Sequence, residues 1–88
     1  MSYKIVYTKT AVKDIPKLKS AHLDKTARAL IDILREDPFT TPPPFEKLVG
    51  NMAGAYFRRI NIQHRLVYQI YEEEKIVKII SLWSHYER

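Results

Sequence analysis

The spacing of apolar residues divides the chain into parts with different expected structures. Residues 3–8, YKIVYT, are rich in β-branched and aromatic side chains, which predicts a first strand. From Thr10 to Glu36 the apolar residues recur at intervals of three and four, as on one face of a helix. Two such stripes, separated by a corner in LKSAHL, predict a helical hairpin whose apolar faces need a sheet to cover them.

The bounds of the first helix depend on two residues. Thr10 is the expected N-cap, because threonine hydroxyls accept hydrogen bonds from the N–H groups of a first helical turn. Pro16 disturbs a helix if it stands in its interior. The helix is therefore predicted either to be kinked at Pro16 or to begin at about Asp14, which would put the proline in the tolerated first turn.

After the helices the pattern changes to short strands. The segment EDPFTTPPPFE ends the second helix, and its three consecutive prolines predict a stiff, extended connector. Strand candidates follow in FEKLVG, AYFRRIN, RLVYQIY and KIVKIISLWSHY, with turn residues between them. Short connections favour antiparallel pairing. The prediction is an α+β fold, in which an N-terminal strand and a helical hairpin pack on one face of a mostly antiparallel sheet.

The composition fits one small domain, residues 1–88, without disulfides. The chain contains no cysteine, and 45% of its residues are hydrophobic, which is enough for one core. No apolar run approaches the roughly 18 residues of a membrane helix, and the start of the chain lacks the apolar stretch of a secretion signal. We therefore expect a soluble cytoplasmic protein without membrane contacts. The net charge of +5 favours a nucleic acid or an acidic protein as partner.

The positive charge concentrates beside aromatic residues in YFRRINIQHRLVYQIY, residues 56–71. Guanidinium groups bind phosphates and aromatic rings stack on bases, so this predicted hairpin is a candidate RNA-binding surface. A two-residue turn in its middle would place Arg58 on the same face as Arg65, whereas a bulge would place Arg59 there. The sequence leaves both registers open.

The second half of the chain resembles a known family. The segment FEKLVGNMAGAYFRRINIQHRLVYQI, followed by WSHY, matches the pattern of the YoeB/Txe branch of the RelE superfamily of bacterial toxins, in order and with the right lengths between. The specific match covers residues 45–88, whereas the first strand and the helices agree in position. The resemblance implies the RelE-like form of the α+β fold, in which the sheet is curved.

The resemblance also implies a function and partners. It implies the toxin of a type II toxin–antitoxin system, an endoribonuclease that cuts mRNA on the translating ribosome and so inhibits translation. It implies a cognate antitoxin of the YefM or Phd type, through which the complex would contact operator DNA indirectly. The small size and an apolar strand edge make a homodimer a further expectation. No cofactor or metal is expected, because no histidine stands at ligand spacing from the carboxylates.

Matched position by position, the catalytic residues of the family correspond to Glu46, Arg65 and His85. Metal-free cleavage uses the 2′-hydroxyl of the RNA as nucleophile, and it needs a base, a cation for the crowded phosphate and an acid for the leaving 5′-oxygen. Glu46 would be the base, Arg65 the cation and His85 the acid. Each also has a structural interpretation, as an exposed strand carboxylate, a turn-ordering arginine and a surface histidine.

Further substrate contacts are expected from Arg59, Arg58, Lys47 and Tyr86. Arg59 would complete the phosphate clamp, and Tyr86 would position the phosphate or stack on a base. Some members of the family have a lysine where this chain has Val49, so Lys47 is the candidate replacement for that basic group. The two adjacent arginines also fit a solvated strand edge or an antitoxin contact.

Two other functions fit the same scaffold. The ParE branch of the superfamily inhibits a protein target such as DNA gyrase, and it would not need a carboxylate and a histidine at these positions. A non-catalytic module that binds RNA or antitoxin is the second alternative. The joint presence of Glu46 and His85 favours the nuclease.

Overall fold

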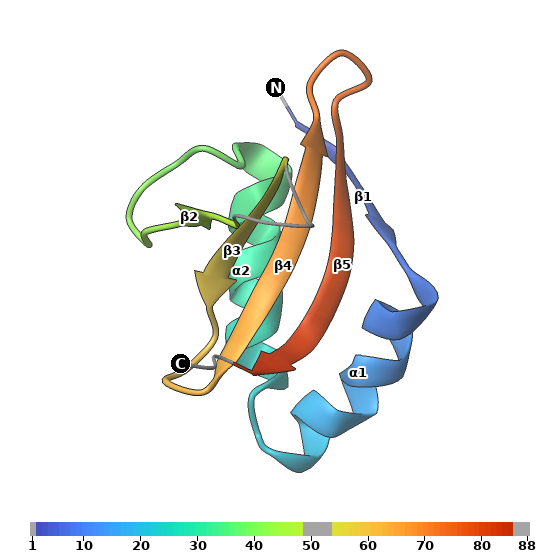
Figure 1. The fold of residues 1–88 in the computed structure, drawn as a ribbon, viewed down its shortest axis with the longest axis vertical. Coiled ribbons are helices and arrows are strands. Elements are labelled where there is room, and N and C mark those ends of the chain that lie inside the picture. The colour runs from blue at the N-terminus through green and yellow to red at the C-terminus, as the bar shows by residue number, and fades with distance from the viewer. Residues whose placement is uncertain (1, 49–53, 86–88) are drawn as a thin grey trace.

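The computed structural model describes residues 2–48 and 54–85, with the backbone alone for His85. The order of elements is β1 (Lys4–Tyr7), α1 (Lys9–Ser20), α2 (Asp24–Glu36), β2 (Glu46–Lys47), β3 (Ala55–Arg59), β4 (His64–Tyr71) and β5 (Ile76–His85). The strands form one sheet in the order β1-β5-β4-β3-β2 (Figure 1). β1 runs parallel to β5, and the other neighbours are antiparallel.

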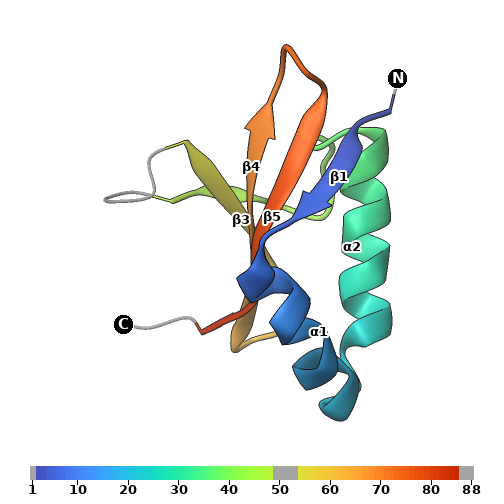
Figure 2. The same cartoon turned by 90° about the vertical axis from the view of Figure 1, so that its right-hand side faces the viewer.

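Both helices lie on the same side of this sheet (Figure 2). The apolar stripes of the helices pack there against the central strands, in a core that includes Leu18, Leu34, Leu66 and Ile79. The predicted α+β architecture is therefore confirmed. Within the part of the chain that the structure describes, neither helix is long and apolar enough to cross a membrane.

The first helix starts earlier than predicted. Thr8, not Thr10, is the N-cap, and its side-chain oxygen accepts a hydrogen bond from a backbone N–H of the first turn at 3.1 Å. α1 then continues through Pro16, so the alternative start near Asp14 is wrong. Because Thr8 directly follows the last residue of β1, the end of strand pairing sets the cap, and helical periodicity does not reveal that position.

The β3–β4 hairpin decides which arginine shares a face with Arg65. Arg59 is paired with Arg65, whereas Arg58 points to the opposite face. The alternative with a two-residue turn, which would have put Arg58 on the face of Arg65, is therefore wrong. Residues 60–63 connect the two strands instead. The side-chain oxygen of Asn61 accepts hydrogen bonds from the backbone N–H groups of Gln63 and His64, at 2.9 and 2.8 Å. These two bonds stabilise the longer loop.

β5 is irregular where it passes the first half of β4. Three residue steps along β4, from Arg65 to Tyr68, correspond to five along β5, from Ser84 to Ile79. Extra residues in one strand form bulges, which bend that strand and raise its twist. β5 accordingly curves toward its end (Figure 1).

Candidate functional site

The face of the sheet opposite the helices carries most of the residues predicted to form the site. Glu46 is paired with Phe57, and Arg59 is paired with Arg65. Paired residues of antiparallel strands share a face, as do residues two apart on one strand. Because Phe57 and Arg59 are two apart on β3, all four side chains project from the same face.

Glu46 and Arg59 meet at a small pocket on this face. Its volume is about 70 Å³, and it is lined by Pro43, Pro44, Glu46, Phe57 and Arg59. This is the room of about two water molecules, at roughly 30 Å³ each. The pocket therefore suits a single phosphate group better than a nucleobase.

Arg65 is held against the sheet beside this pocket. Its guanidinium carbon lies 4.6 Å from the centre of the Phe57 ring, and its Nη2 donates a hydrogen bond to Ser84 Oγ at 3.4 Å. The ring and the hydroxyl together restrict the direction of the guanidinium. Phe57 and Ser84 were not predicted as parts of the site. The position of Phe57 two residues before Arg59 was the signal that could have found it.

The charges at this face favour an anion. Arg59 and Arg65 stand directly opposite each other, and like charges in that position destabilise a sheet. Glu46 carries one negative charge against these two positive ones. Guanidinium groups bind a phosphate through bidentate hydrogen bonds, so a face that carries two of them is suited to that anion. Among the described residues no group of histidine, cysteine or acidic side chains could hold a metal ion.

Arg58 is not a substrate contact, and that prediction is corrected here. The residue is fully buried, with 0% of its surface exposed. Its guanidinium donates hydrogen bonds to the carbonyls of Pro38 and Thr40, both at 2.9 Å, to the carbonyl of Pro43 and to Tyr68 Oη at 3.2 Å. The guanidinium also lies over the Phe45 ring, 5.0 Å from its centre. The guanidinium of Arg58 is therefore used for contacts within the protein and is not exposed to a substrate.

These contacts tie the proline-rich connector, residues 38–44, to the middle of the sheet. Burial raises the pKa of Tyr68, and the positive charge of Arg58 opposes that rise. The phenol therefore stays protonated at neutral pH, and its oxygen accepts the Nε–H of Arg58. Pro43 is held directly, and Glu46 follows three residues later. Arg58 thus holds the segment that leads to Glu46, and the pairing of β2 with β3 holds Glu46 itself.

Lys47 is not brought to the pocket. It is paired with Tyr56, which packs against the core on the helix side. Adjacent residues of a strand point to opposite faces, so Lys47, at the edge of the sheet, projects away from the face of Glu46. The predicted substrate contact of Lys47 is corrected for this reason. Val49, the position that Lys47 was expected to replace, lies outside the described residues.

The end of β5 lies beside Arg65. Ser84 is paired with Arg65, and the backbone of His85 is paired with that of His64. The strand that carries the predicted acid therefore reaches the edge of the site. The side chain of His85 and the whole of Tyr86 lie outside the described residues, so their roles stay predictions.

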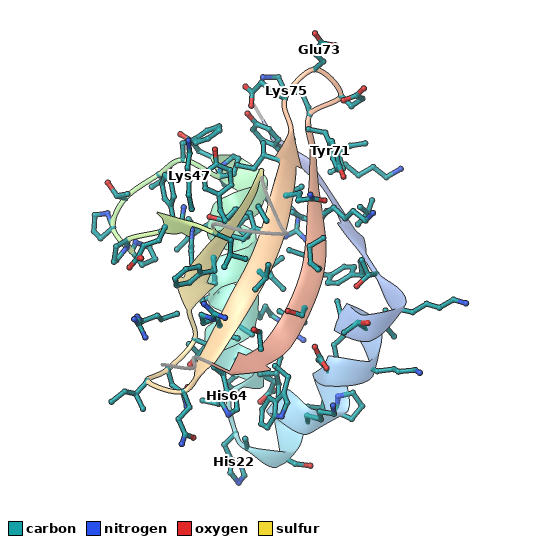
Figure 3. The ribbon with its side chains drawn as sticks, in the orientation of Figure 1. His22, Lys47, His64, Tyr71, Glu73 and Lys75 are labelled. Atoms are coloured by element: carbon teal, nitrogen blue, oxygen red, sulfur yellow. The ribbon has the colours of Figure 1, made fainter. Side chains whose placement is uncertain are left out.

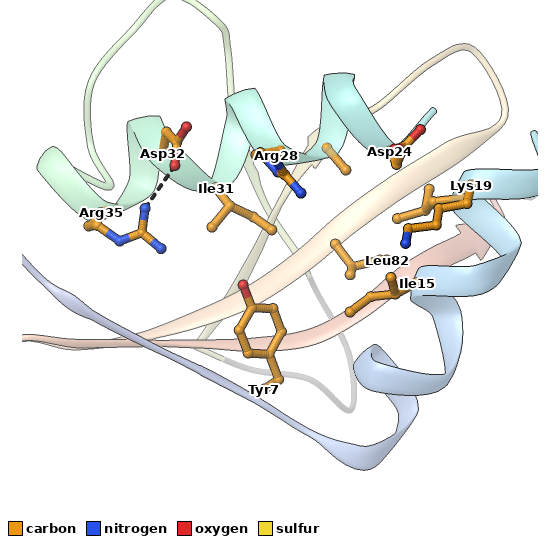
Figure 4. Close-up of a pocket in the computed structure, with 11 residues that line it drawn as sticks. Tyr7, Ile15, Lys19, Asp24, Arg28, Ile31, Asp32, Arg35 and Leu82 are labelled. Atoms are coloured by element: carbon orange, nitrogen blue, oxygen red, sulfur yellow. Dashed lines mark hydrogen bonds and ion pairs between the residues drawn. The ribbon is translucent and has the colours of Figure 1, made fainter. Parts of the chain in front are cut away.

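A larger cavity lies on the helix side of the sheet (Figure 4). Its volume is about 370 Å³, and its walls include Ile15, Leu18, Ile31 and the ion pair of Arg35 with Asp32 at 2.7 Å. Size alone would favour this cavity as a binding site. The smaller pocket is the better candidate for catalysis, because a carboxylate and a guanidinium group, those of Glu46 and Arg59, line it together.

Comparison with known proteins agrees with the resemblance seen in the sequence. The family model for YoeB-like toxins of bacterial type II toxin–antitoxin systems matches residues 7–86. Toxin YoeB of Synechocystis is 41% identical over 64 residues, which cover 73% of this chain and 72% of that protein. Toxin RelK of Mycobacterium tuberculosis is 38% identical over 65 residues, which cover 70% of this chain and 74% of that protein.

Solved structures give the same result. The YoeB/ParE toxin from Agrobacterium tumefaciens superposes with a TM-score of 0.83 and 29% identity, over 94% of this chain and 99% of that one. The YoeB–YefM complex from Staphylococcus aureus contains a chain that superposes with a TM-score of 0.77 and 30% identity, over 98% and 100% of the two chains.

The role of Arg58 predicts that its replacement costs much more stability than replacement of its neighbour Arg59. Arg58→Met leaves buried carbonyls without donors and should lower the free energy of unfolding by about 3 kcal/mol or more. Arg58→Lys should recover only part of this loss, because an ammonium cannot reproduce the planar fork of donors. Arg59→Met, the exposed control, should change stability by no more than about 0.5 kcal/mol. Urea denaturation measures all three, and equal losses for the two methionine variants would contradict the assigned role.

Proposed function

This chain belongs to the YoeB-like toxins of bacterial type II toxin–antitoxin systems, and we propose that it acts as a metal-independent endoribonuclease. The observation that supports this most strongly is the shared face of Glu46, Arg59 and Arg65, on which Glu46 and Arg59 line a small pocket and Arg65 lies beside it. A carboxylate on the same face as two guanidinium groups offers a proton acceptor and a phosphate clamp. These are the groups that cleavage by an internal 2′-hydroxyl requires.

The proposed reaction has one chemical step. Glu46 takes the proton of the 2′-hydroxyl, whose oxygen attacks the adjacent phosphorus. Arg59 and Arg65 stabilise the negative charge that develops on the phosphorane oxygens. His85 gives a proton to the leaving 5′-oxygen, since an imidazole can carry a proton near neutral pH. The products are a 2′,3′-cyclic phosphate and a free 5′-hydroxyl, so no water is consumed in this step.

Tyr86 has a supporting part in this scheme. A phenol next to the acid can donate a hydrogen bond to a phosphate oxygen or stack on a neighbouring base. Both roles rest on the resemblance to the family, in which the chain ends in His-Tyr, here His85 and Tyr86.

The proposed substrate is mRNA in the ribosome, and its cleavage would inhibit translation in the cytoplasm. The proposed inhibitor is a cognate antitoxin of the YefM type, because a similar toxin was solved as a YoeB–YefM complex. The resemblance to a YoeB dimer from Staphylococcus aureus supports a homodimer as a further form. Contact with operator DNA would run through the antitoxin.

The alternatives are a ParE-like inhibitor of a protein such as DNA gyrase and a non-catalytic binding module. Neither requires an acid–base pair, so replacement of Glu46 and His85 separates them from the nuclease. Glu46→Gln alone should lower the cleavage rate at least about 100-fold, because the amide cannot accept the proton. The double variant with His85→Gln should lose toxicity while it still binds antitoxin.

The matched control for these variants is Glu73→Gln. Glu73 lies in the turn between β4 and β5 (Figure 3), whereas Arg65 lies at the opposite end of β4. Its cleavage rate should equal that of the unchanged protein. Mapping of transcript ends on ribosomes gives the rates. Full toxicity in the double variant would exclude the nuclease in favour of one of the alternatives.

The nucleophile can be removed from the substrate instead of the protein. An mRNA with a single 2′-deoxynucleotide on the 5′ side of the scissile phosphate should not be cut at that bond. Binding should stay within about threefold, because the phosphate contacts of the arginines remain. Quantitative primer extension measures the cleavage, and filter binding of the programmed ribosome measures the affinity. Unchanged cleavage of the deoxy substrate would show that another nucleophile attacks.

Metal removal should leave the reaction unchanged. Because ribosomes need magnesium, we would strip the protein with EDTA, remove the chelator and compare initial rates on intact ribosomes. A phosphorothioate at the scissile phosphate provides a second arm. Sulfur binds soft metals better than it binds Mg²⁺, so a catalytic metal site would show rescue by Cd²⁺. We expect equal rates after stripping and no rescue, and a rescued phosphorothioate substrate would contradict the scheme.

A further inference from the structure

One edge of β5 is only partly covered by a strand. The pairing of β1 with β5 ends at Tyr7 and Ile79, while β5 continues to His85. The backbone groups beyond Ile79 on that edge need other partners, since a strand edge is satisfied only by further hydrogen bonds or by water. Two side chains at the start of the helical hairpin provide some of them.

The first of these side chains is that of Thr8. Its backbone N–H donates to Ile79 O at 3.1 Å, and its hydroxyl donates to Ile80 O at 2.7 Å. The same hydroxyl oxygen accepts the N–H of Ala11 at 3.1 Å, which caps α1. One threonine therefore joins the beginning of the helix to the edge of β5.

The second side chain is that of Asp14, on α1. Its Oδ2 accepts a hydrogen bond from the backbone N–H of Leu82 at 2.9 Å, although the two residues are 68 positions apart. Asp14 is buried, with 4% of its surface exposed, and Lys17 Nζ lies 3.7 Å from its other oxygen. Burial of a carboxylate costs free energy that a hydrogen bond to it must offset. An apolar residue in this place would pack against the core without that cost.

The segment that Asp14 holds is the bulged part of β5. Leu82 lies between Ile79 and Ser84, where β5 carries more residues than the facing part of β4. Just beyond it, Trp83 stacks on His64 with ring centres 3.9 Å apart, and Ser84 accepts the hydrogen bond of Arg65. Bulges leave a strand free to bend in more than one way, so an outside anchor is needed to fix its direction.

We propose that Asp14 is a positioning residue for catalysis, which fixes the end of β5 through the Leu82 amide and so sets the backbone from which His85 would act. This inference rests on the proposed function, in which His85 is the acid. Asp14 contacts β5 from α1, on the edge of β5 that β1 leaves uncovered. The candidate site lies across the other edge of β5, on β4 and β3. Asp14 itself therefore touches neither the RNA nor the reacting atoms.

Amide hydrogen exchange tests the anchor without any need for activity. In Asp14→Ala, the amides of Leu82 and Ser84 should exchange at least about tenfold faster, since the carboxylate that accepts the hydrogen bond of the Leu82 N–H is gone. The amides of Val67 and Tyr68 on β4 should keep their rates. Asp14→Asn retains an acceptor oxygen and should stay close to the unchanged protein. Asp32→Ala, which removes an exposed helical carboxylate, is the matched control. Unchanged exchange at Leu82, or equal acceleration on β4, would overturn the proposal.

Kinetics on programmed ribosomes test the catalytic part. Asp14→Ala should lower kcat about tenfold and leave KM within about twofold, with rescue by Asp14→Asn. In a His85→Gln background, Asp14→Ala should cause no further loss, because the residue that it positions is already inactive. A loss that adds fully to that of His85→Gln, or one confined to KM, would overturn the positioning role.

Two further outcomes are separable. If Asp14→Ala does not fold, Asp14→Ser replaces it in both experiments with the same expectations. If the unchanged protein does not cleave RNA, the proposed function fails, and the exchange rates still decide whether Asp14 anchors β5.

Discussion

A charged group that is buried away from water must find its partners inside the protein, and Arg58 finds them in the backbone of the proline-rich connector. Its hydrogen bonds go to uncharged oxygens of residues 38–43 and to Tyr68. The connector lacks the backbone pairing of a strand, so these bonds hold it against the sheet. The short strand β2, with Glu46, continues from this anchored segment, and its place on the open face depends on the anchor.

The site is assembled from parts that are far apart in the sequence. Arg59 and Arg65 come from one hairpin, whose register places them opposite each other. Glu46 is brought to them from one edge of the sheet by the Arg58 anchor. In our proposal Asp14 does the same for the end of β5 from the helix side. In this proposal two buried charged groups hold the segments that carry Glu46 and the end of β5, while the central hairpin would supply the phosphate clamp.

The sequence predicted the elements better than the contacts between them. Periodicity identified the helical hairpin and the strands, and the charge and aromatic pattern of residues 56–71 identified the arginine hairpin. Alternation alone showed that one of Arg58 and Arg59 shares a face with Arg65, but the choice depends on the loop that Asn61 stabilises. The burial of Arg58 could not be predicted, because its acceptors are backbone carbonyls, which every residue has. The same holds for Thr8, since the end of β1 determines the cap.

The chemistry of the cut ends tests the central claim most directly, because it depends on the nucleophile and on no variant of the protein. Mass spectrometry of short products released from programmed ribosomes distinguishes the possible termini. Attack by the 2′-hydroxyl, with Glu46 as base and the two arginines on the phosphate, predicts a 2′,3′-cyclic phosphate, or the monophosphate formed when it opens, and a 5′-hydroxyl. Products with a 3′-hydroxyl and a 5′-phosphate would contradict this account, because they require attack by water.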